Sequence, residues 1–275
     1  MHIIDGKSLA AKILDEQKLR ISQSAKKPRL AVLLVGQDSA SELYVKRKQD
    51  AAAAIGAELI VKKIQTASTA ELVSVIEHWN EDSDINGILV QLPLPKEIDT
   101  KTVIEKIALH KDVDGFRQGS PVISPTHEAV LRLLNETPMK LSGSQAVILA
   151  NSKTFADPLA HLLAAGGVSV DIWNPDDIGT SDKDRLKEEI DLLITAIGRP
   201  GFVHASMLRD DVVLIDIGTT HIEGKVKGDA DFESFKDTDT WITPVPGGVG
   251  PMTVALLMRN LVDLAYTSSP SGASE

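Results

Sequence analysis

The sequence predicts an α/β protein of two domains in which helices flank parallel sheets. Short apolar runs of strand length alternate with longer amphipathic stretches, the pattern of βα units. The run from Leu30 to Val35 is continuously apolar and is bounded by Pro28 and Gly36, as expected of a strand buried on both faces. The length of 275 residues suits two domains of ordinary size.

The expected elements follow one another along the chain. Ser39 and Glu42 have the spacing of a capping box at the start of the second helix, and Gly56 is placed to end it. Strands are expected at 29–36, 58–61, 87–90, 146–149, 168–173, 191–197 and 212–217. Helices are expected at 9–24, 39–55, 70–79, 126–134, 155–165 and 254–266.

Composition excludes several classes of protein. The net charge of −10 argues against a protein that binds nucleic acid through its phosphates. The chain contains no cysteine, which removes disulfides, thiolate catalysis and cysteine metal sites, and no other metal site is expected. No signal peptide and no membrane-spanning run is seen, so we expect a soluble cytoplasmic protein.

Glycine, serine and proline cluster between Gly115 and Pro125, which indicates a domain boundary near residue 118. We expect a first domain at 1–118 and a second at 119–251, with a cleft between them. The last helix, 252–266, is expected to pack back on the first domain. Residues 267–275 read as a disordered tail.

Two side chains that could act on a flat substrate lie one helical turn apart. Tyr44 and Lys48 share a helix face, so the ring could stack on a substrate while the amine moves a proton. A solvated surface helix is the plainer reading of an isolated Tyr-x-x-x-Lys. The short-chain dehydrogenases also use this pair, and in them it follows a glycine-rich Rossmann turn. Here no G-x-G-x-x-G is present and the pair precedes the Rossmann-like half of the chain, so this alternative fails on the order of the segments.

Three further segments are candidates for binding. Gln91 follows the strand that ends at Val90, where ligands bind in open α/β sheets. One of the two carboxylates of Asp112 and Asp114 could accept paired N–H donors from an aminopyrimidine-like edge, although an ordinary Asp-Gly turn explains the same residues. The run 243–253, TPVPGGVGPMT, brings backbone close to a ligand and leads into a helix expected to begin near Thr253.

Together and in this order, these segments resemble the methylenetetrahydrofolate dehydrogenase/methenyltetrahydrofolate cyclohydrolase family, of the bacterial bifunctional type called FolD. The resemblance begins at Asp5 and extends to the last helix. It implies a folate-binding catalytic domain, a second domain that is Rossmann-like, and a homodimer. The implied reactions are oxidation of 5,10-methylenetetrahydrofolate by a nicotinamide cofactor and hydrolysis of the methenyl product to 10-formyltetrahydrofolate.

The resemblance also implies roles for individual residues. Lys48 should be the catalytic lysine of hydrolysis, with Gln91 bonded to it. Tyr44 should stack on the aminobenzoate and Asp114 should hold the pterin. The other implied contacts with the folate substrate are Val90, Leu92, Pro246, Gly247, Gly248, Val249 and Gly250.

The departures from the family cluster at the cofactor. Where the family has a Gly-Arg-Ser turn and a second glycine, this chain has Ala150, Asn151, Ser152 and Ala156. Two added methyl groups hinder close approach to the cofactor phosphates, and the lost arginine is a partner for a 2′-phosphate. Asp176 and Asp177 lie where the family has a His-Ser-(basic)-Thr segment. Two acids would repel the 2′-phosphate of NADP, whereas one could accept from the 2′-hydroxyl of NAD, which favours NAD. The remaining expected cofactor contacts are Thr195, Gly218 and Thr219.

Three functions stay open at this point. The first is the bifunctional enzyme with NAD or NADP. The second is a cyclohydrolase whose dehydrogenase activity is weak or lost, because the cofactor turn is altered. The third is a folate-binding protein without catalysis, which has little need of Lys48. Asp229 to Phe232 also match the family, with no chemical role evident.

Overall fold

The computed structural model describes residues 1–267 and divides into two compact units. The three-stranded unit comprises residues 10–125 and the described chain after Thr253. The six-stranded unit comprises Met1–Leu9 and Thr126–Thr253. The division after Pro125 lies beyond the boundary expected near residue 118, and the first residues join the six-stranded unit through strand β1. Of the expected disordered tail, 268–275 lies outside the described residues.

The three-stranded unit contains a parallel sheet with the order β3-β2-β4. The central strand β2 is buried along almost its whole length, as its apolar run predicts, whereas β3 is an edge strand with exposed residues. Its strands are β2 (Arg29–Val35), β3 (Glu58–Ile64) and β4 (Gly87–Val90). Its helices are α1 (Gly6–Ser22), α2 (Ser39–Ile55), α3 (Thr69–Glu81), α4 (Thr100–Glu105) and α8 (Val249–Thr267), with a 3-10 turn at Leu109–Lys111.

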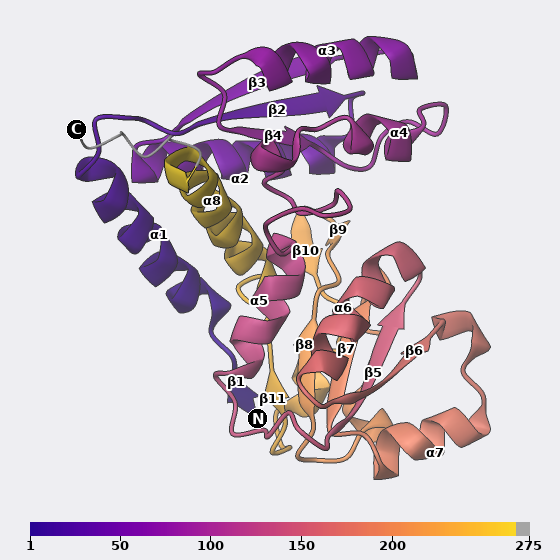
Figure 1. Ribbon diagram of the computed structural model, residues 1–275. Helices are drawn as coiled ribbons and strands as arrows, with labels where there is room; N and C mark the ends of the chain where they lie inside the picture. Colours follow the sequence, from indigo (N-terminus) through magenta and orange to yellow (C-terminus); the bar gives the residue numbers. More distant parts are fainter. Residues whose placement is uncertain (268–275) are drawn as a thin grey trace. The chain divides into compact units, whose positions relative to one another are not determined.

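Alternate residues of β2 pack on opposite faces of this sheet, because successive side chains of a strand point to opposite sides. Leu30, Val32 and Leu34 pack with α2 and α8 on one face. Ala31 and Leu33 pack with α3 and α4 on the other. Figure 1 shows α2 and α3 on opposite sides of the three strands. Helix α2, which carries Lys48, therefore packs on the face of Leu30, Val32 and Leu34.

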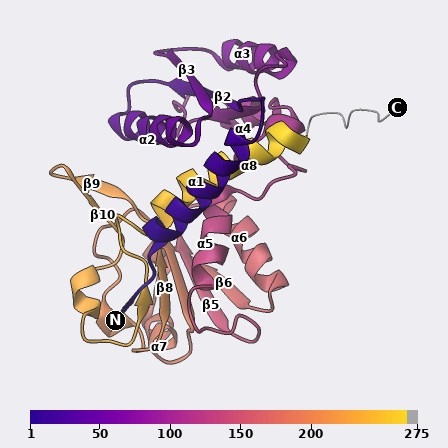
Figure 2. The same ribbon diagram turned by 90° about the vertical axis from the view of Figure 1, so that its left-hand side faces the viewer.

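Helix α8 closes the core of the three-stranded unit. Its residues Met258 and Leu261 join Ile21 of α1 and Leu30 of β2 in one buried cluster. Arg20 of α1 donates to Asp263 of α8 at 2.6 Å, and Figure 2 shows the two helices side by side. The last helix therefore packs on the sheet of the first half of the chain.

The six-stranded unit contains a parallel sheet with the order β1-β11-β8-β7-β5-β6. Its strands are β1 (His2–Ile3), β5 (Gln145–Ala150), β6 (Ser169–Trp173), β7 (Leu192–Ala196), β8 (Val213–Asp216) and β11 (Trp241–Ile242). An antiparallel hairpin lies apart, β9 (Thr220–Ile222) with β10 (Lys225–Lys227). The helices are α5 (Pro125–Leu134), α6 (Lys153–Ala165) and α7 (Thr180–Glu188), with 3-10 turns at Pro175–Asp177, Ala205–Met207 and Phe232–Phe235. The predicted fold class is confirmed.

Helix starts are where the sequence-based expectations failed. The N-cap of α2 is Asp38, whose carboxylate accepts from the amide of Ser41 at 2.8 Å, so the capping box from Ser39 was wrong. Gly56 ends α2 in the left-handed conformation as predicted, with φ of 85°. Helix α8 begins at Val249 and not near Thr253. Helices α4 and α7 and four short strands were not anticipated.

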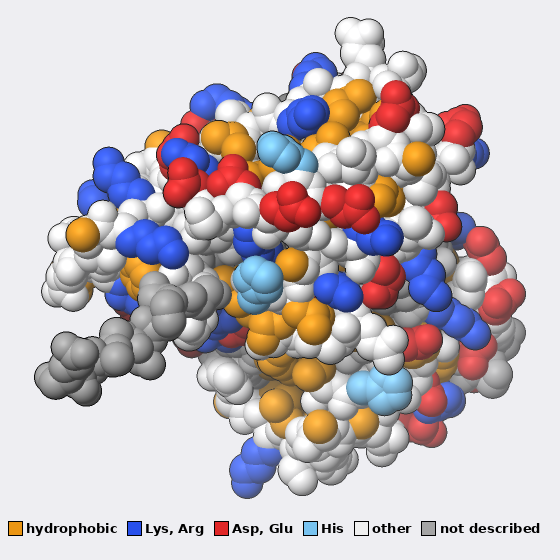
Figure 3. Space-filling view, turned by 45° about the horizontal axis from the view of Figure 1, so that its top comes forward, with side chains coloured by type: hydrophobic (Ala, Val, Ile, Leu, Met, Phe, Trp, Pro, Cys, Tyr) orange, Lys and Arg blue, Asp and Glu red, His pale blue; other side chains and the backbone are white. Residues whose placement is uncertain are grey.

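The face drawn in Figure 3 is not strongly basic. Figure 3 shows acidic and basic side chains interspersed over the face it displays. Among the described residues, no helix combines the length and the apolar content needed to cross a bilayer.

Candidate active site

The expected lysine and glutamine come together in the three-stranded unit. Tyr44 and Lys48 lie one turn apart on α2, and the Nζ of Lys48 donates to Oε1 of Gln91 at 2.9 Å. Gln91 directly follows β4, and its amide donates to the carbonyl of Leu33 at 2.9 Å, so the pairing of β4 with β2 fixes its position. The side-chain amide of Gln91 also donates to the carbonyl of Leu92 at 2.7 Å. Both the oxygen and the nitrogen of the Gln91 side-chain amide are therefore hydrogen-bonded, and this fixed amide orients the amine of Lys48.

In the segment from Lys111 to Asp114, three residues stabilise the fold and one interacts with Lys48. Lys111 is 5% exposed and donates to three carbonyls at the end of α3. The Asp112 carboxylate accepts from the amides of Gly115 and Arg117, each at 3.0 Å. Val113 is buried in the core. Asp114 alone is left to interact with Lys48, and this division could not be read from the sequence.

Electrostatics couple the two ionisable groups of this site. Burial lowers the pKa of Lys48 below its ordinary value, and the Asp114 carboxylate opposes that shift. Burial raises the pKa of Asp114 to about 6; Lys48 opposes this rise and Asp112 adds to it. The amine is thus brought nearer to neutrality at physiological pH than a surface lysine. This is the condition for a lysine that accepts and returns protons.

The remaining expected contacts of this unit are neighbours of Lys48 or Gln91 along the chain. Val90 is buried as the last residue of β4, and the peptide bond between Leu92 and Pro93 is cis. Tyr44 is partly exposed, with the guanidinium of Arg47 5.6 Å from its ring centre.

In the six-stranded unit, the expected cofactor turn joins β5 to α6. Ser152 caps α6, its hydroxyl accepting from the amide of Phe155 at 3.4 Å. Ala156 has no exposed surface and Ala150 has 6%, so both methyl groups pack into the protein interior. The side-chain amide of Asn151 donates to the carbonyl of Ile197 at 2.7 Å, which ties the end of β5 to the end of β7. The surface offered to a phosphate is the start of α6, where helix amides favour anions.

Two buried carboxylates organise the loops at the ends of β7 and β8. The Asp216 carboxylate accepts from the amides of Gly218, Asp229 and Ala230 at 2.8–3.1 Å. Burial raises the pKa of Asp216 to about 7, the three amides oppose this rise, and Asp229 adds to it. A Cβ on Gly218 would lie 2.2 Å from the Asp229 carboxyl carbon, and one on Gly228 would lie 2.1 Å from Oδ2 of Asp216. Only glycine fits at these two positions.

Asp229 fixes the loop after β7. It has no exposed surface and accepts from the amides of Ile197 and Arg199, each at 2.8 Å, and from the hydroxyl of Thr195 at 3.0 Å. The side chain of Thr195, an expected cofactor contact, is thus buried against Asp229. Thr219 is exposed beside Gly218.

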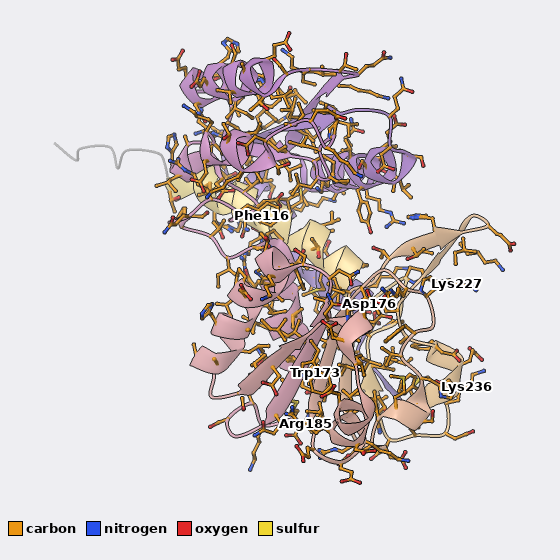
Figure 4. All side chains as sticks on the ribbon, turned by 90° about the vertical axis from the view of Figure 1, so that its right-hand side faces the viewer. Phe116, Trp173, Asp176, Arg185, Lys227 and Lys236 are labelled. Atoms are coloured by element: carbon orange, nitrogen blue, oxygen red, sulfur yellow. The ribbon has the colours of Figure 1, made fainter. Side chains whose placement is uncertain are left out.

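Asp176, expected to contact the cofactor ribose, has a partner that the sequence did not reveal. Its carboxylate accepts from Nη2 of Arg199 at 2.6 Å. It follows the end of β6, as labelled in Figure 4. The structural roles of Asp229 and Arg199 were missed, and the one signal for Asp229 was its place in an otherwise unexplained family motif.

The proline-glycine run forms the connection from β11 to α8. The bond between Val245 and Pro246 is cis, and Gly247 has φ of 122°. The amide of Gly248 donates to the carbonyl of Pro244 at 2.7 Å, where a Cβ would lie 2.8 Å from the same oxygen. Val249 and Gly250 are already the first residues of α8. The backbone is therefore tightly folded here and lies at a helix N-terminus.

Comparison with known proteins matches both parts of the chain. The catalytic domain of tetrahydrofolate dehydrogenase/cyclohydrolase matches residues 4–114, and its NAD(P)-binding domain matches residues 124–269. The bifunctional protein FolD of Campylobacter hominis is 39% identical over 280 residues, covering 96% of this chain and 97% of that protein.

Two solved structures extend the likeness. That of the bifunctional enzyme FolD from Campylobacter jejuni has a TM-score of 0.89 and 35% identity, covering 97% of this chain and 99% of that one. That of the methylenetetrahydrofolate dehydrogenase-cyclohydrolase of Trypanosoma brucei, complexed with NADP cofactor and inhibitor, has a TM-score of 0.90 and 27% identity, covering 97% of each chain. The chain therefore belongs to the tetrahydrofolate dehydrogenase/cyclohydrolase family, of the FolD type.

Proposed function

We propose that this protein oxidises 5,10-methylenetetrahydrofolate to 5,10-methenyltetrahydrofolate with NAD or NADP and hydrolyses the product to 10-formyltetrahydrofolate. The observation that carries the proposal is the hydrogen bond from Lys48 to Gln91, formed by a lysine of lowered pKa beside Asp114. A protein that only bound folate would have no need to hold an amine in this state. Membership of the family supports both activities.

In the hydrolytic step, Lys48 moves the proton that water must lose. Water adds to the methenyl carbon, a C–O bond forms, and the neutral amine of Lys48 accepts the proton. The C–N5 bond then breaks, its electron pair stays on N5, and Lys48 returns the proton there. The added hydroxyl loses its remaining proton to solvent as it becomes the carbonyl of the formyl group, so the reaction releases one proton. Gln91 engages one N–H of the amine and so keeps the lone pair turned toward the substrate. A neutral lysine also avoids repulsion of the cationic methenyl group.

Individual residues are proposed to bind the substrate. Asp114 accepts two N–H donors from the aminopyrimidine edge of the pterin, which requires its ionised form. Tyr44 stacks on the aminobenzoate. The other proposed contacts are Val90, Leu92, Pro246, Gly247, Gly248, Val249 and Gly250.

A bound nicotinamide dinucleotide would supply the acceptor for the hydride of the oxidative step. The residues present fit such a group: the start of α6 at Ser152 suits its phosphates, and Gly218 and Thr219 follow the end of β8. Ala150 and Ala156 bury their methyl groups and do not obstruct this surface. This observation favours the bifunctional enzyme over a cyclohydrolase without dehydrogenase activity.

NAD is the cofactor that we propose. Asp176 can accept from the ribose 2′-hydroxyl of NAD and repels the 2′-phosphate of NADP. Asn151 is engaged with the carbonyl of Ile197 and offers no charge to that phosphate. The homodimer and the cytoplasmic location remain predictions.

Two assays on the purified protein test the proposal. Reduction of NAD or NADP with methylenetetrahydrofolate is followed by absorbance, and opening of the methenyl compound is followed separately without cofactor. We expect both reactions, with NAD preferred. Rapid opening of the methenyl compound without reduction of either cofactor would indicate a cyclohydrolase that lacks dehydrogenase activity. Activity in neither assay would contradict the proposal.

A further inference from the structure

The ion pair between Asp176 and Arg199 bridges two strand ends that flank the cofactor turn. Strand β5 pairs with β6 on one side and with β7 on the other. Asp176 follows β6 and Arg199 follows β7, so their contact of 2.6 Å spans the end of β5, where α6 begins. In dinucleotide-binding folds, an acid at the end of the second strand binds the ribose 2′-hydroxyl, and an arginine nearby accommodates a 2′-phosphate. This chain places both side chains together.

The backbone of Arg199 is fixed by a hydrogen bond, and its side chain is partly exposed. Its amide donates to the buried carboxylate of Asp229 at 2.8 Å, and the carbonyl of Gly198 accepts from the Thr220 hydroxyl at 3.2 Å. Its guanidinium lies 5.8 Å from the ring centre of Phe202. The Arg199 side chain is 41% exposed and that of Asp176 is 68% exposed, so solvent and a ligand can reach the pair. A pre-positioned arginine of this kind is suited to bind a phosphate in a forked geometry.

We propose that Arg199 is the residue that determines dinucleotide selectivity, and that Asp176 withholds it from the 2′-phosphate of NADP. Asp176 thus acts in two ways: it presents an acceptor to the 2′-hydroxyl of NAD, and it occupies the arginine that would otherwise bind NADP. The family arginine missing at Asn151 is replaced by one from another loop, held in a paired state. This inference rests on the proposed nicotinamide-binding function.

The proposal differs from simple charge repulsion in what it predicts for two substitutions combined. If Asp176 only repels the 2′-phosphate, removing it strengthens binding by the same factor whether Arg199 is present or not. If Asp176 withholds Arg199, the gain depends on the arginine. Coupling between residues in contact is measured by such a double-mutant cycle.

The experiment titrates the wild type, Asp176→Ser, Arg199→Gln and the double variant with NAD, NADP, 2′,5′-ADP and 5′-AMP by calorimetry. Because 2′,5′-ADP and 5′-AMP differ only in the 2′-phosphate, comparing their affinities isolates the contribution of that phosphate to binding. The readout does not depend on turnover. Asp177→Ser is the matched control, because Asp177 is an exposed acid next to Asp176. Circular dichroism checks that each variant folds.

We expect Asp176→Ser to strengthen 2′,5′-ADP binding about tenfold or more when Arg199 is present, and less than about threefold when it is added to Arg199→Gln. Arg199→Gln alone and Asp177→Ser should change 2′,5′-ADP binding little. Equal gains with and without the arginine would overturn the inference while leaving the proposed function intact. A large loss of 2′,5′-ADP binding in Arg199→Gln alone would also overturn it, because the arginine would then already serve the phosphate. No binding of either dinucleotide by any of the four proteins would contradict the dehydrogenase function itself.

Discussion

The two units present their chemistry in opposite ways. In the three-stranded unit, an amine on α2 meets an amide at the end of β4, and the titratable groups Lys48 and Asp114 remain partly exposed. In the six-stranded unit, the most strongly engaged carboxylates, Asp216 and Asp229, are buried and bind backbone amides of the chain itself. We propose that the first arrangement moves protons on a substrate. The second holds loops in the shape that a cofactor requires, and this difference predicts different responses to mutation.

The largest expected effect is on stability, in the six-stranded unit. Gly228→Ala places a methyl group 2.1 Å from Oδ2 of Asp216, so the carboxylate or the loop must move and lose amide bonds. We expect a loss of about 3 kcal/mol in the free energy of unfolding, measured by chemical denaturation. Gly250→Ala is the control for stability, because a Cβ at Gly250 meets no atom within 4 Å. Equal stability of the two variants would contradict the constraint at the carboxylates.

The next effect concerns pH and belongs to the three-stranded unit. Burial raises the pKa of Asp114 to about 6, and its ionised form is the one that we propose accepts from the pterin. Binding of tetrahydrofolate should therefore be constant well above pH 6 and weaken as the pH falls through 6, up to about tenfold for each further pH unit. Lys48 and Asp112 are the charged groups that influence this titration.

Calorimetric titration of tetrahydrofolate between pH 5 and 8 measures that dependence. Asp114→Asn is the control: it should bind more weakly at pH 8 and lose most of the dependence. A wild type that binds equally well at pH 5 and pH 8 would remove Asp114 from pterin recognition.

The smallest effect concerns the start of the helix that carries Lys48. Asp38 accepts from the amide and the hydroxyl of Ser41, at 2.8 and 2.7 Å. Asp38→Ala should therefore lower the free energy of unfolding by about 1 kcal/mol. Ser39→Ala should change it by less than about 0.5 kcal/mol, because Ser39 is already inside the helix. The reverse order in thermal and chemical denaturation would restore the cap expected from the sequence.

Local patterns predicted the parts of the molecule that depend on local physics. The four-residue spacing of Tyr44 and Lys48 placed them on one helix face, and the strand-end rule placed Gln91 at the sheet edge. Burial of β2 followed from its uninterrupted apolar run. Two start sites were misplaced, for local reasons as well. Asp38 and Ser39 are both good caps, and the last helix was expected to begin near Thr253 although the first turn of a helix tolerates a proline such as Pro251.

Contacts between distant segments could not be predicted in the same way. The bond between Lys48 and Gln91 depends on the pairing of β2 with β4, which sequence periodicity does not specify. Asp216 and Asp229 meet because the hairpin of β9 and β10 returns the chain, and neither strand was expected. The pair of Asp176 and Arg199 requires the strand order around β5. The cofactor side was therefore the less accurately predicted of the two.

The central claim is that Lys48 performs the hydrolytic step and that cofactor binding does not depend on it. The most direct test is the rate of methenyltetrahydrofolate opening in Lys48→Gln, with dinucleotide binding measured on the same sample. Lys46→Gln is the control, since Lys46 is an exposed lysine of the same helix that pairs with Asp50. We expect opening to fall by about a hundredfold or more in Lys48→Gln, with dinucleotide binding and the fold unchanged. Opening at the wild-type rate in a folded Lys48→Gln protein would contradict the account.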